Sequence, residues 1–485
     1  MNILIVGNGF DLSHYLPTKY DHFMDVMKAI EFKNTGEKVS DLSINTVSEW
    51  MRLLEQMFEK RKGLEQSNYD MDFNELFSCI RDKWFIKKTE ELYLTEQVKI
   101  SSKDVLKLQY RLELNDWYQY FKSHVEEIKT WIDFEQKIEE VLAILANCIV
   151  EIERIKSHNE LFRYFQYDQR GENQIIEKNF KILSFFNFIK PEYYQHKLPA
   201  VYLGDKPSFT EKSRENLNPK FCHGASLENG FNPSGFLAYL YLQLEEFIEI
   251  FNLYLDLIVN EFRPQVQLQI DAKEWNYPDL IFSFNYTNTY ARIHDSVKIE
   301  YLHGSHGEYQ NIILGIADLE HENLKMLKAY GFTKYHQKLL KDTDYLFLDE
   351  FKNKISIHKK KIEYFEKDFG HMDAQKRKFE RQNLMENDSK LDLNIYIWGH
   401  SLDVSDKDYI IDIFSLNDEI DRNVKVIVYY FDKNAKFSLL NNLLAILGKD
   451  KVEIWMKNRW LKFEPNPNVV EINTIQPVDL PKFEK

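Results

Sequence analysis

A chain of 485 residues is too long for one simple domain, and its hydrophobic fraction of 44% is ample for a buried core. The formal net charge of −14 argues against a surface that collects DNA or RNA. The three cysteines, Cys79, Cys148 and Cys222, lie far apart, which argues against a disulfide framework and fits a reducing compartment.

The opening stretch NILIVGNGFD, residues 2–11, predicts a buried strand that ends in a glycine-rich turn. Gly7 and Gly9 fill the first two places of a dinucleotide fingerprint, but Leu12 stands at the third. The turn by itself leaves two interpretations open, a phosphate-binding loop and a tight turn without a ligand. Asp11 would repel a pyrophosphate and fits better beside a ribose hydroxyl or a developing positive charge.

Helices are predicted for most of the chain before residue 279. Thr18 as N-cap and Asp21 three residues later predict a helix start, whose N-terminus would favour a bound anion. Residues 130–155 carry an amphipathic stripe, and residues 236–262 are apolar around most of the helix. Residues 166–234, rich in proline and glycine, predict an irregular connector or a lid.

Two apolar segments decide the expected location of the protein. The first, residues 3–6, has no positively charged leader before it and predicts a strand rather than a signal peptide. The longest, residues 235–258, carries four acidic residues that a membrane-spanning helix would not tolerate. We therefore expect a soluble, cytoplasmic protein without a membrane partner.

Strands are predicted again after residue 279, each apolar on both faces, as in a sheet covered by helices on both sides. They are residues 280–287, 298–304, 311–318, 394–402 and 424–431. Polar side chains gather where these strands stop, which is where an open parallel sheet binds its ligand. The charged segment 322–390 predicts a solvated helical pair rather than a nucleic-acid arm, because acids interrupt its basic runs.

Asn285 and His303 are the strongest candidates at these strand ends. The Asn285 carboxamide both donates and accepts, so it can hold a ribose diol and orient a water, although loop asparagines often stabilise only their own turn. His303 can take a proton near neutral pH, and Gly304 after it allows close backbone approach; a satisfied core histidine is the alternative. A loose group of potential metal ligands comprises His303, His306, Glu308 and His321. Its spacing matches no recognised pattern, so no metal is expected.

The turn GHSLDVSD, residues 399–406, is not a nucleophile elbow, because Asp403 stands where that motif needs glycine. We interpret it as a turn that offers Gly399, Ser401 and Asp406 to a phosphate or a ribose.

These motifs, in this order, resemble the AbiH family of bacterial phage abortive-infection proteins. The resemblance spans most of the chain and is carried by GNGFDLSHYLPTKYDHF near the start, WIDFE at 131–135, FNYTNTY at 284–290, YLHG at 301–304, LGIAD at 314–318 and GHSLDVSDKD at 399–408. The family core resembles, more distantly, the SIR2-like domains of other antiphage systems. That likeness implies NAD binding, and NAD hydrolysis in the defence members, with Asn285 and His303 as catalytic residues.

This sequence departs from the SIR2-like pattern at three places, and these differences bear on which nucleotide is bound. Asn8 and Phe10 replace small residues of the first turn, Thr287 stands in place of an aspartate, and Asp406 comes late. The nucleotide-binding residues that we predict are Gly7, Asn8, Gly9, Phe10, Thr287, Gly304, Gly399, His400, Ser401 and Asp406.

The predicted fold is α/β, a Rossmann-like, mostly parallel sheet of about six strands with large helical insertions. The predicted parts are a core of residues 1–35 and 270–440, a helical insertion domain at 36–269, a charged helical insert at 322–390 and a C-terminal segment at 441–485.

The predicted function is antiphage defence through cleavage of the nicotinamide N-glycosidic bond of NAD. In this hypothesis residues 7–9 hold the pyrophosphate, Asn285 holds the ribose and water, His303 is the general base, and Asp11 stabilises the growing positive charge. Two alternatives are a toxic nuclease using the basic residues 359–361 and 376–378, and a non-catalytic nucleotide-sensing switch. The hypothesis leaves room for a phage-derived trigger and for a homo-oligomer, and it makes nucleic acid a disfavoured partner.

Overall fold

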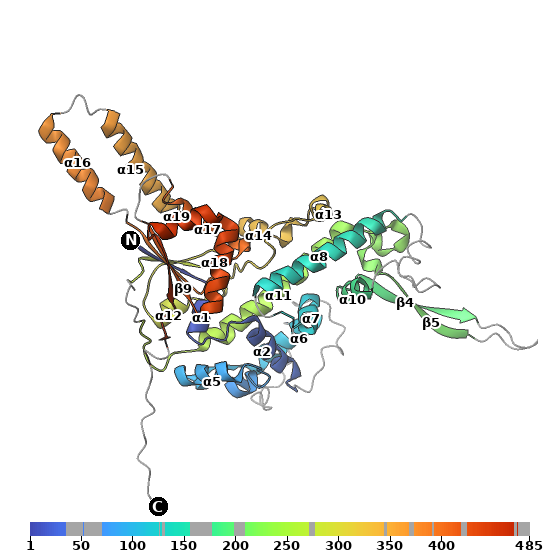
Figure 1. Cartoon of the computed structure of the whole chain (residues 1–485). Coiled ribbons are helices and arrows are strands. Elements are labelled where there is room, and N and C mark those ends of the chain that lie inside the picture. Colours follow the sequence, from blue (N-terminus) through green and yellow to red (C-terminus); the bar gives the residue numbers. More distant parts are fainter. Residues whose placement is uncertain are drawn as a thin grey trace, which may run out of the picture.

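A six-stranded sheet forms the centre of the computed structural model (Figure 1). The structure describes residues 1–34, 52, 70–125, 127–128, 131–155, 177–197, 209–270, 277–343, 347–367, 373–389, 392–418, 424–469 and 473. The strands are β1 (Asn2–Val6), β6 (Leu280–Ser283), β7 (Ile299–Tyr301), β8 (Asn394–Trp398), β9 (Lys425–Tyr430) and β10 (Leu461–Pro465). All neighbours pair in parallel, in the order β10-β9-β8-β1-β6-β7. Counted within the sheet, this is the doubly wound order 3-2-1-4-5-6, so the predicted α/β fold is confirmed.

The position of β1 decides where a ligand can bind. Its last residue, Val6, pairs with Ser283 at the end of β6 and with Trp398 at the end of β8. The loops after these three strands therefore leave the sheet at the same edge. The chain order reverses beside β1, and a crevice at such a switch point is the usual ligand site of an open parallel sheet.

Both faces of the sheet are buried, each in its own apolar core. Leu4 and Val6 on β1 pack in the core that includes the helical insertion. Ile3 and Ile5 face the other core, which contains α17 (Lys407–Ser415), α18 (Lys433–Leu447), α19 (Lys449–Lys457) and the start of α15 (Asp349–Lys367). Burial on both faces explains why β1 is a continuous apolar run rather than an alternating one.

Within the six-stranded sheet, one predicted strand is wrong and one strand was missed. Residues 311–318 form no strand; the Leu314 N–H and C=O bond instead to the side-chain amide of Gln337, at 3.0 Å each. These bonds satisfy a buried backbone without a neighbouring strand. The sixth strand is β10, beyond residue 440, where we expected only a C-terminal segment. It lies at the sheet edge, where one neighbour suffices and a continuous apolar run is not required.

The helical insertion matches its two long predicted helices, which are α8 (Trp131–Glu153) and α11 (Pro233–Leu257). Shorter helices pack with them: α2 (Tyr20–Phe32), α5 (Lys83–Leu92), α6 (Ser102–Leu114) and α7 (Asp116–Ser123). The expected cap of α2 is wrong, because the Thr18 hydroxyl donates to Asn8 Oδ1 at 2.7 Å and Lys19 is the N-cap. Of the helices that the structure describes, none is both long enough and apolar enough to span a bilayer.

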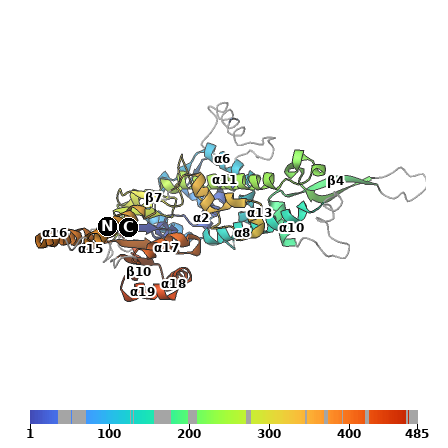
Figure 2. The same cartoon turned by 90° about the horizontal axis from the view of Figure 1, so that it is seen from above.

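The proline-rich segment 166–234 contains regular structure that we did not predict. Helix α10 (Glu177–Phe185) precedes an antiparallel hairpin of β4 (Ile189–Lys197) and β5 (Phe209–Leu217). Residues 166–176 and 198–208 lie outside the described residues. The hairpin extends from the end of α8 and α11 that is remote from the sheet (Figures 1 and 2). The described part of this segment therefore does not form a lid over the strand ends.

The predicted helical pair in the charged segment 322–390 is confirmed. Helices α15 and α16 (Ala374–Ser389) project together from the body beside the sheet (Figures 1 and 2). The same segment also contains α13 (Glu322–Met326) and α14 (Lys334–Leu340), which pack back on the body.

Candidate functional site

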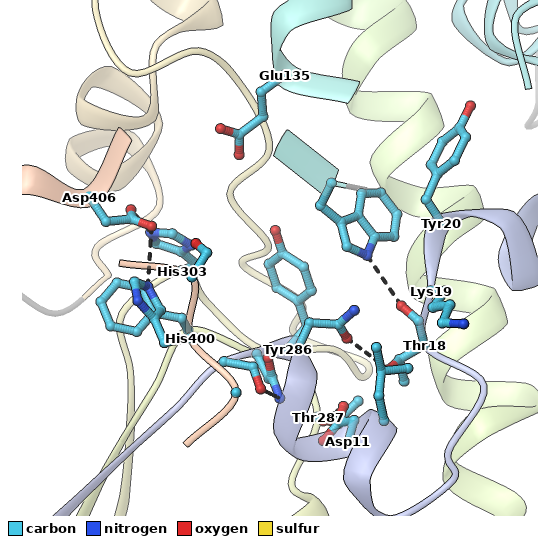
Figure 3. Close-up of a pocket in the computed structure, with 18 of the residues that line it drawn as sticks. Asp11, Thr18, Lys19, Tyr20, Glu135, Tyr286, Thr287, His303, His400 and Asp406 are labelled. Carbon is cyan, nitrogen blue, oxygen red and sulfur yellow. Dashed lines mark hydrogen bonds and ion pairs between the residues drawn. The ribbon is translucent and has the colours of Figure 1, made fainter. Parts of the chain in front are cut away.

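A cavity of about 320 Å³ opens at the carboxyl edge of the sheet, between β1, β6, β8 and the helical insertion (Figure 3). Its volume is near the lower end of the range of roughly 300–1,000 Å³ that is usual for ligand pockets. The loops after the strands contribute Gly7, Asn8, Asp11, Asn285, Thr287, His303, Gly399, His400, Ser401 and Asp406. Segments almost 300 residues apart in the sequence thus meet around one hollow, as the hypothesis requires.

Three predicted nucleotide-binding residues do not line this cavity, and each has a packing role instead. The Gly9 N–H donates to the Gly399 carbonyl at 2.9 Å, so it is not free for a pyrophosphate. Phe10 is 1% exposed and packs edge-on against Trp398 at 5.0 Å. Gly304 has φ +79°, and a Cβ there would lie 2.0 Å from the Asn311 carbonyl oxygen.

The glycines of the first turn are explained by a close approach of two loops. A Cβ on Gly7 would lie 2.6 Å from the His400 Cα, and one on Gly9 would lie 2.7 Å from the Gly399 Cα. Gly399 itself has φ +74°, and a Cβ there would meet the Phe10 nitrogen at 2.0 Å. No side chain fits at these three positions, whether or not a phosphate binds nearby.

Asp11 lies at one end of the cavity on α1 (Asn8–Ser13), directly after β1. Its Oδ2 accepts a hydrogen bond from the Thr287 hydroxyl at 2.7 Å. Its Oδ1 is buried and has no hydrogen-bond partner within the described part of the chain. Burial raises the pKa of Asp11, and the Thr287 and Thr289 hydroxyls oppose that rise. Such a carboxyl group is ready to accept a hydroxyl proton or to face a positive charge.

Asn285 ties the first two loops together. Its Nδ2 donates to the Gly7 carbonyl at 2.9 Å, and its backbone N–H donates to the Ser283 hydroxyl at 3.1 Å. The residue is 5% exposed and lines the cavity. The amide group is therefore held in one orientation, with its nitrogen on the β1 loop.

Asp406 lies between two histidines (Figure 3). Its Oδ1 is 3.2 Å from His303 Nε2, and its Oδ2 is 3.4 Å from His400 Nε2. His400 Nδ1 accepts a hydrogen bond from the Leu402 N–H at 3.0 Å, so Nε2 carries the proton that faces Asp406. Burial lowers the pKa of His303 to about 4, against the opposing effect of Asp406, so its imidazole is neutral at pH 7.

Lys334 and Glu135 complete the charged part of the site, although we did not predict either. Lys334 Nζ lies 2.8 Å from Glu135 Oε1 and 3.7 Å from Asp406 Oδ1. Burial raises the pKa of Glu135 to about 7, although Lys334 lowers it. Burial alone would raise the pKa of Asp406, but Lys334 and His303 hold it well below its usual value.

The sequence does contain a signal for Glu135, because this residue ends the WIDFE motif. By its position in a predicted helix, however, Glu135 cannot be distinguished from a solvent-exposed glutamate. Lys334 lies in the charged segment, where a lysine is most often solvated, and no local pattern distinguishes it.

Aromatic rings form the wall on the side of the helical insertion. Trp131 at the start of α8 lines the cavity, and its indole N–H donates to the Thr18 carbonyl at 3.2 Å. Tyr20 on α2 and Phe251 on α11 also line the cavity, and Phe284 and Tyr286 line it from the loop after β6. A cavity with aromatic walls and convergent carboxyl, imidazole and amide groups can hold a planar ring and a sugar and can activate a water.

Comparison with known protein families matches residues 3–190 and 234–430 to the family described as bacteriophage abortive infection AbiH. No curated protein and no solved structure matches the chain significantly. The family match contains the strand-end loops after β1, β6, β7 and β8, together with α8 and α14. It covers well over half of the chain, and the chain therefore belongs to the bacteriophage abortive infection AbiH family.

Proposed function

We propose that this protein acts in phage abortive infection by hydrolysing the N-glycosidic bond between nicotinamide and ribose in NAD. The observation that carries the proposal is the convergence of Asp11, Asn285 and His303, from three separate loops, on one cavity. The likeness of the strand-end motifs to SIR2-like domains supports NAD as the nucleotide.

In the proposed reaction, Asp11 and His303 have separate roles. The bond between ribose C1′ and the pyridinium nitrogen breaks, and its electron pair leaves with nicotinamide, which becomes neutral. The Asp11 carboxylate stabilises the positive charge that grows on the ribose. A water attacks C1′ and gives its proton to His303, and ADP-ribose is the second product.

The state of His303 suits the role of a base. Its imidazole is neutral because its pKa is about 4. With the proton on Nε2, which faces Asp406 Oδ1 at 3.2 Å, the other nitrogen is left to accept a proton. Asp406 then stabilises the imidazolium that forms, as the third group of a catalytic triad does.

The proposal is tested by mixing purified protein with NAD and measuring released nicotinamide by chromatography, with and without phage lysate. We expect His303→Ala and Asp11→Asn to lower the rate by about 10²–10⁴-fold, the usual effect of losing a general base or an electrostatic stabiliser. His223→Ala is the matched control, because His223 is exposed and does not line the cavity. Absence of nicotinamide under both conditions would contradict the proposal.

A non-catalytic nucleotide sensor uses the same cavity and is separated by the same variants. It predicts that NAD or ADP-ribose raises the melting temperature without turnover, and that His303→Ala leaves this binding largely intact. A metabolite profile of infected cells that express the wild type or Asn285→Ala gives the cellular readout. Hydrolysis predicts loss of NAD only with the wild type.

A further inference from the structure

Two side chains of the helical insertion face the cavity side by side. Trp131 and Glu135 are four residues apart on α8, a spacing that places them on one face of the helix, and both line the cavity. The Glu135 side chain is 15% exposed. In Figure 3 it lies at the opposite end of the labelled side chains from Asp11.

With all of their carboxyl groups ionised, the residues that line the cavity carry an excess of one negative charge. Among the described residues the lining carboxyl groups are Asp11, Glu135 and Asp406, and the lining ammonium groups are Lys19 and Lys334. Lys19 is already paired with Asp82 at 3.0 Å, outside the lining. The charge balance favours a cationic group in the part of the cavity beside Glu135.

Lys334 does not cancel the charge of Glu135 by itself. It is shared between Glu135 at 2.8 Å and Asp406 at 3.7 Å, so two carboxyl groups compete for one ammonium group. Asp406 also has His303 and His400 as partners. In the described structure Lys334 is the charged partner of Glu135, and because that ammonium group is shared with Asp406, a further positive charge beside Glu135 is stabilised.

We propose that Trp131 and Glu135 form a subsite for a cationic aromatic ring, with the ring stacked on the indole and its charge facing the carboxylate. This inference rests on the proposed function, in which the cationic ring is the nicotinamide pyridinium of oxidised NAD. An indole face and a carboxylate together attract a planar cation by cation–π and Coulomb interactions. The subsite discriminates NAD from NADH, whose nicotinamide ring is neutral.

Binding of the cation is coupled to a proton. Burial raises the pKa of Glu135 to about 7, and Lys334, Asp406 and Asp403 also act on it, while His303 and His400 contact Asp406. A cationic ring beside Glu135 favours its charged form and lowers that pKa. Affinity for NAD therefore rises as the pH increases from 6 to 8, whereas affinity for NADH does not.

The test measures dissociation constants for NAD and NADH by calorimetry, with the full-length protein carrying His303→Ala to prevent turnover. We expect NAD to bind about tenfold more tightly than NADH at pH 8, since a charge pair a few ångströms apart near a protein surface is worth more than the 1.4 kcal/mol that tenfold requires. Adding Glu135→Gln, which keeps the size and hydrogen-bonding ends of the side chain, should bring the ratio close to one and remove the pH dependence.

A control variant and the possible outcomes distinguish failure of the cationic subsite from failure of the proposed function. Glu139→Gln removes the same charge one turn further along α8 without touching the cavity and should leave the ratio unchanged. Equal affinities for NAD and NADH in the parent protein would overturn the cationic subsite while leaving NAD binding intact. Binding of neither nucleotide would overturn the proposed function itself. If Glu135→Gln lowers the stability of the protein, Trp131→Leu provides a second variant. We expect it to weaken the binding of NAD more than the binding of NADH.

Discussion

Gly399 is the residue on which the geometry of the site depends most directly. Two loops from neighbouring strands meet at its Cα, and Asn285 fixes a third loop by donating to the Gly7 carbonyl at 2.9 Å. Positive φ and close backbone contact act together at this position, whereas either alone would be tolerated by some other residues. The site is therefore set by backbone packing before any ligand is considered.

Gly399→Ala should be far more costly than the same change at Gly448, which also has a positive φ, of +77°, but has nothing within 4 Å of a Cβ. The positive-φ backbone costs alanine about 1–3 kcal/mol at either position. At Gly399 alone, the clash of the new Cβ with the Phe10 backbone adds about 1–3 kcal/mol to the loss of stability. Urea unfolding of the two variants checks this, and equal losses of stability would contradict it.

His22→Leu should stabilise the protein at acid pH. His22 on α2 is fully buried, and its Nε2 lies 3.8 Å from Asp82 Oδ2, too far for a hydrogen bond. Burial lowers the pKa of His22 well below 6.5, against the opposing effect of Asp82. The unfolded chain thus binds a proton that the folded one does not, so the native state loses stability as the pH falls below 6.5. We expect the variant to gain about 1 kcal/mol over the wild type at pH 5.5 relative to pH 8.

Thermal unfolding at both pH values measures that difference. The exposed His223 provides the comparison, because His223→Leu removes an imidazole without changing a buried group. A gain for His22→Leu that is the same at pH 8 and pH 5.5 would show that the buried imidazole does not titrate.

At the scale of elements, α8 and α14 are joined to the sheet edge by buried charges. Glu135 on α8, Lys334 at the start of α14 and Asp406 before α17 form a chain of contacts at 2.8 and 3.7 Å. These groups come from the helical insertion, the charged segment and the sheet core. The two inserts are therefore not appendages of the core at this point, because each supplies a side chain to the same cavity.

Removal of the shared ammonium group should be strongly destabilising. Lys334→Met leaves two buried carboxyl groups without their common partner, and breaking such a pair costs about 3–5 kcal/mol. Combining it with Glu135→Gln should recover at least about 1 kcal/mol, because one uncompensated charge disappears. A double-mutant cycle measured by urea unfolding tests the coupling, and strictly additive effects would refute it.

The exposed pair Lys354–Glu350 on α15, at 2.6 Å, is the control for that cycle. Lys354→Met should leave stability unchanged within error, since water already screens both charges.

At the scale of the whole molecule, the cavity lies where the sheet meets the helical insertion, while α15 and α16 project away from it (Figures 1 and 2). Phe351 and Ile355 at the base of α15 are buried in the core beneath the sheet. Further along the pair, Tyr364 and Phe379 are more than 60% exposed. The outer part of the pair is thus independent of the core.

Replacing residues 358–387 with a short glycine–serine linker should leave both stability and nucleotide binding unchanged. The deletion keeps the buried base of α15, and loss of exposed helix costs little, within about 0.5 kcal/mol. Urea unfolding and the NAD titration measure the two quantities. The nuclease alternative makes the opposite forecast, namely salt-sensitive RNA or DNA binding that disappears with this deletion.

The sequence by itself determined five of the six strands of the sheet and most of the residues at its carboxyl edge. Continuous apolar runs such as residues 3–6 and 394–398 are local signals, because a strand buried on both faces must be apolar at every position. The polar residues that follow them, Asn285 and His303 among them, were found because parallel strands place their carboxyl ends together.

Only the tertiary structure decided the rest. Glu135 and Lys334 are charged residues on helices, and a helix acid or lysine looks the same in the sequence whether it is solvated or buried against a distant partner. The need for Gly7 and Gly9 likewise becomes clear only in the structure, because their backbone packs against Gly399, nearly 400 residues away. Burial and long-range contact determine the pKa of a group and the space around it, and neither quantity is encoded by neighbours along the chain.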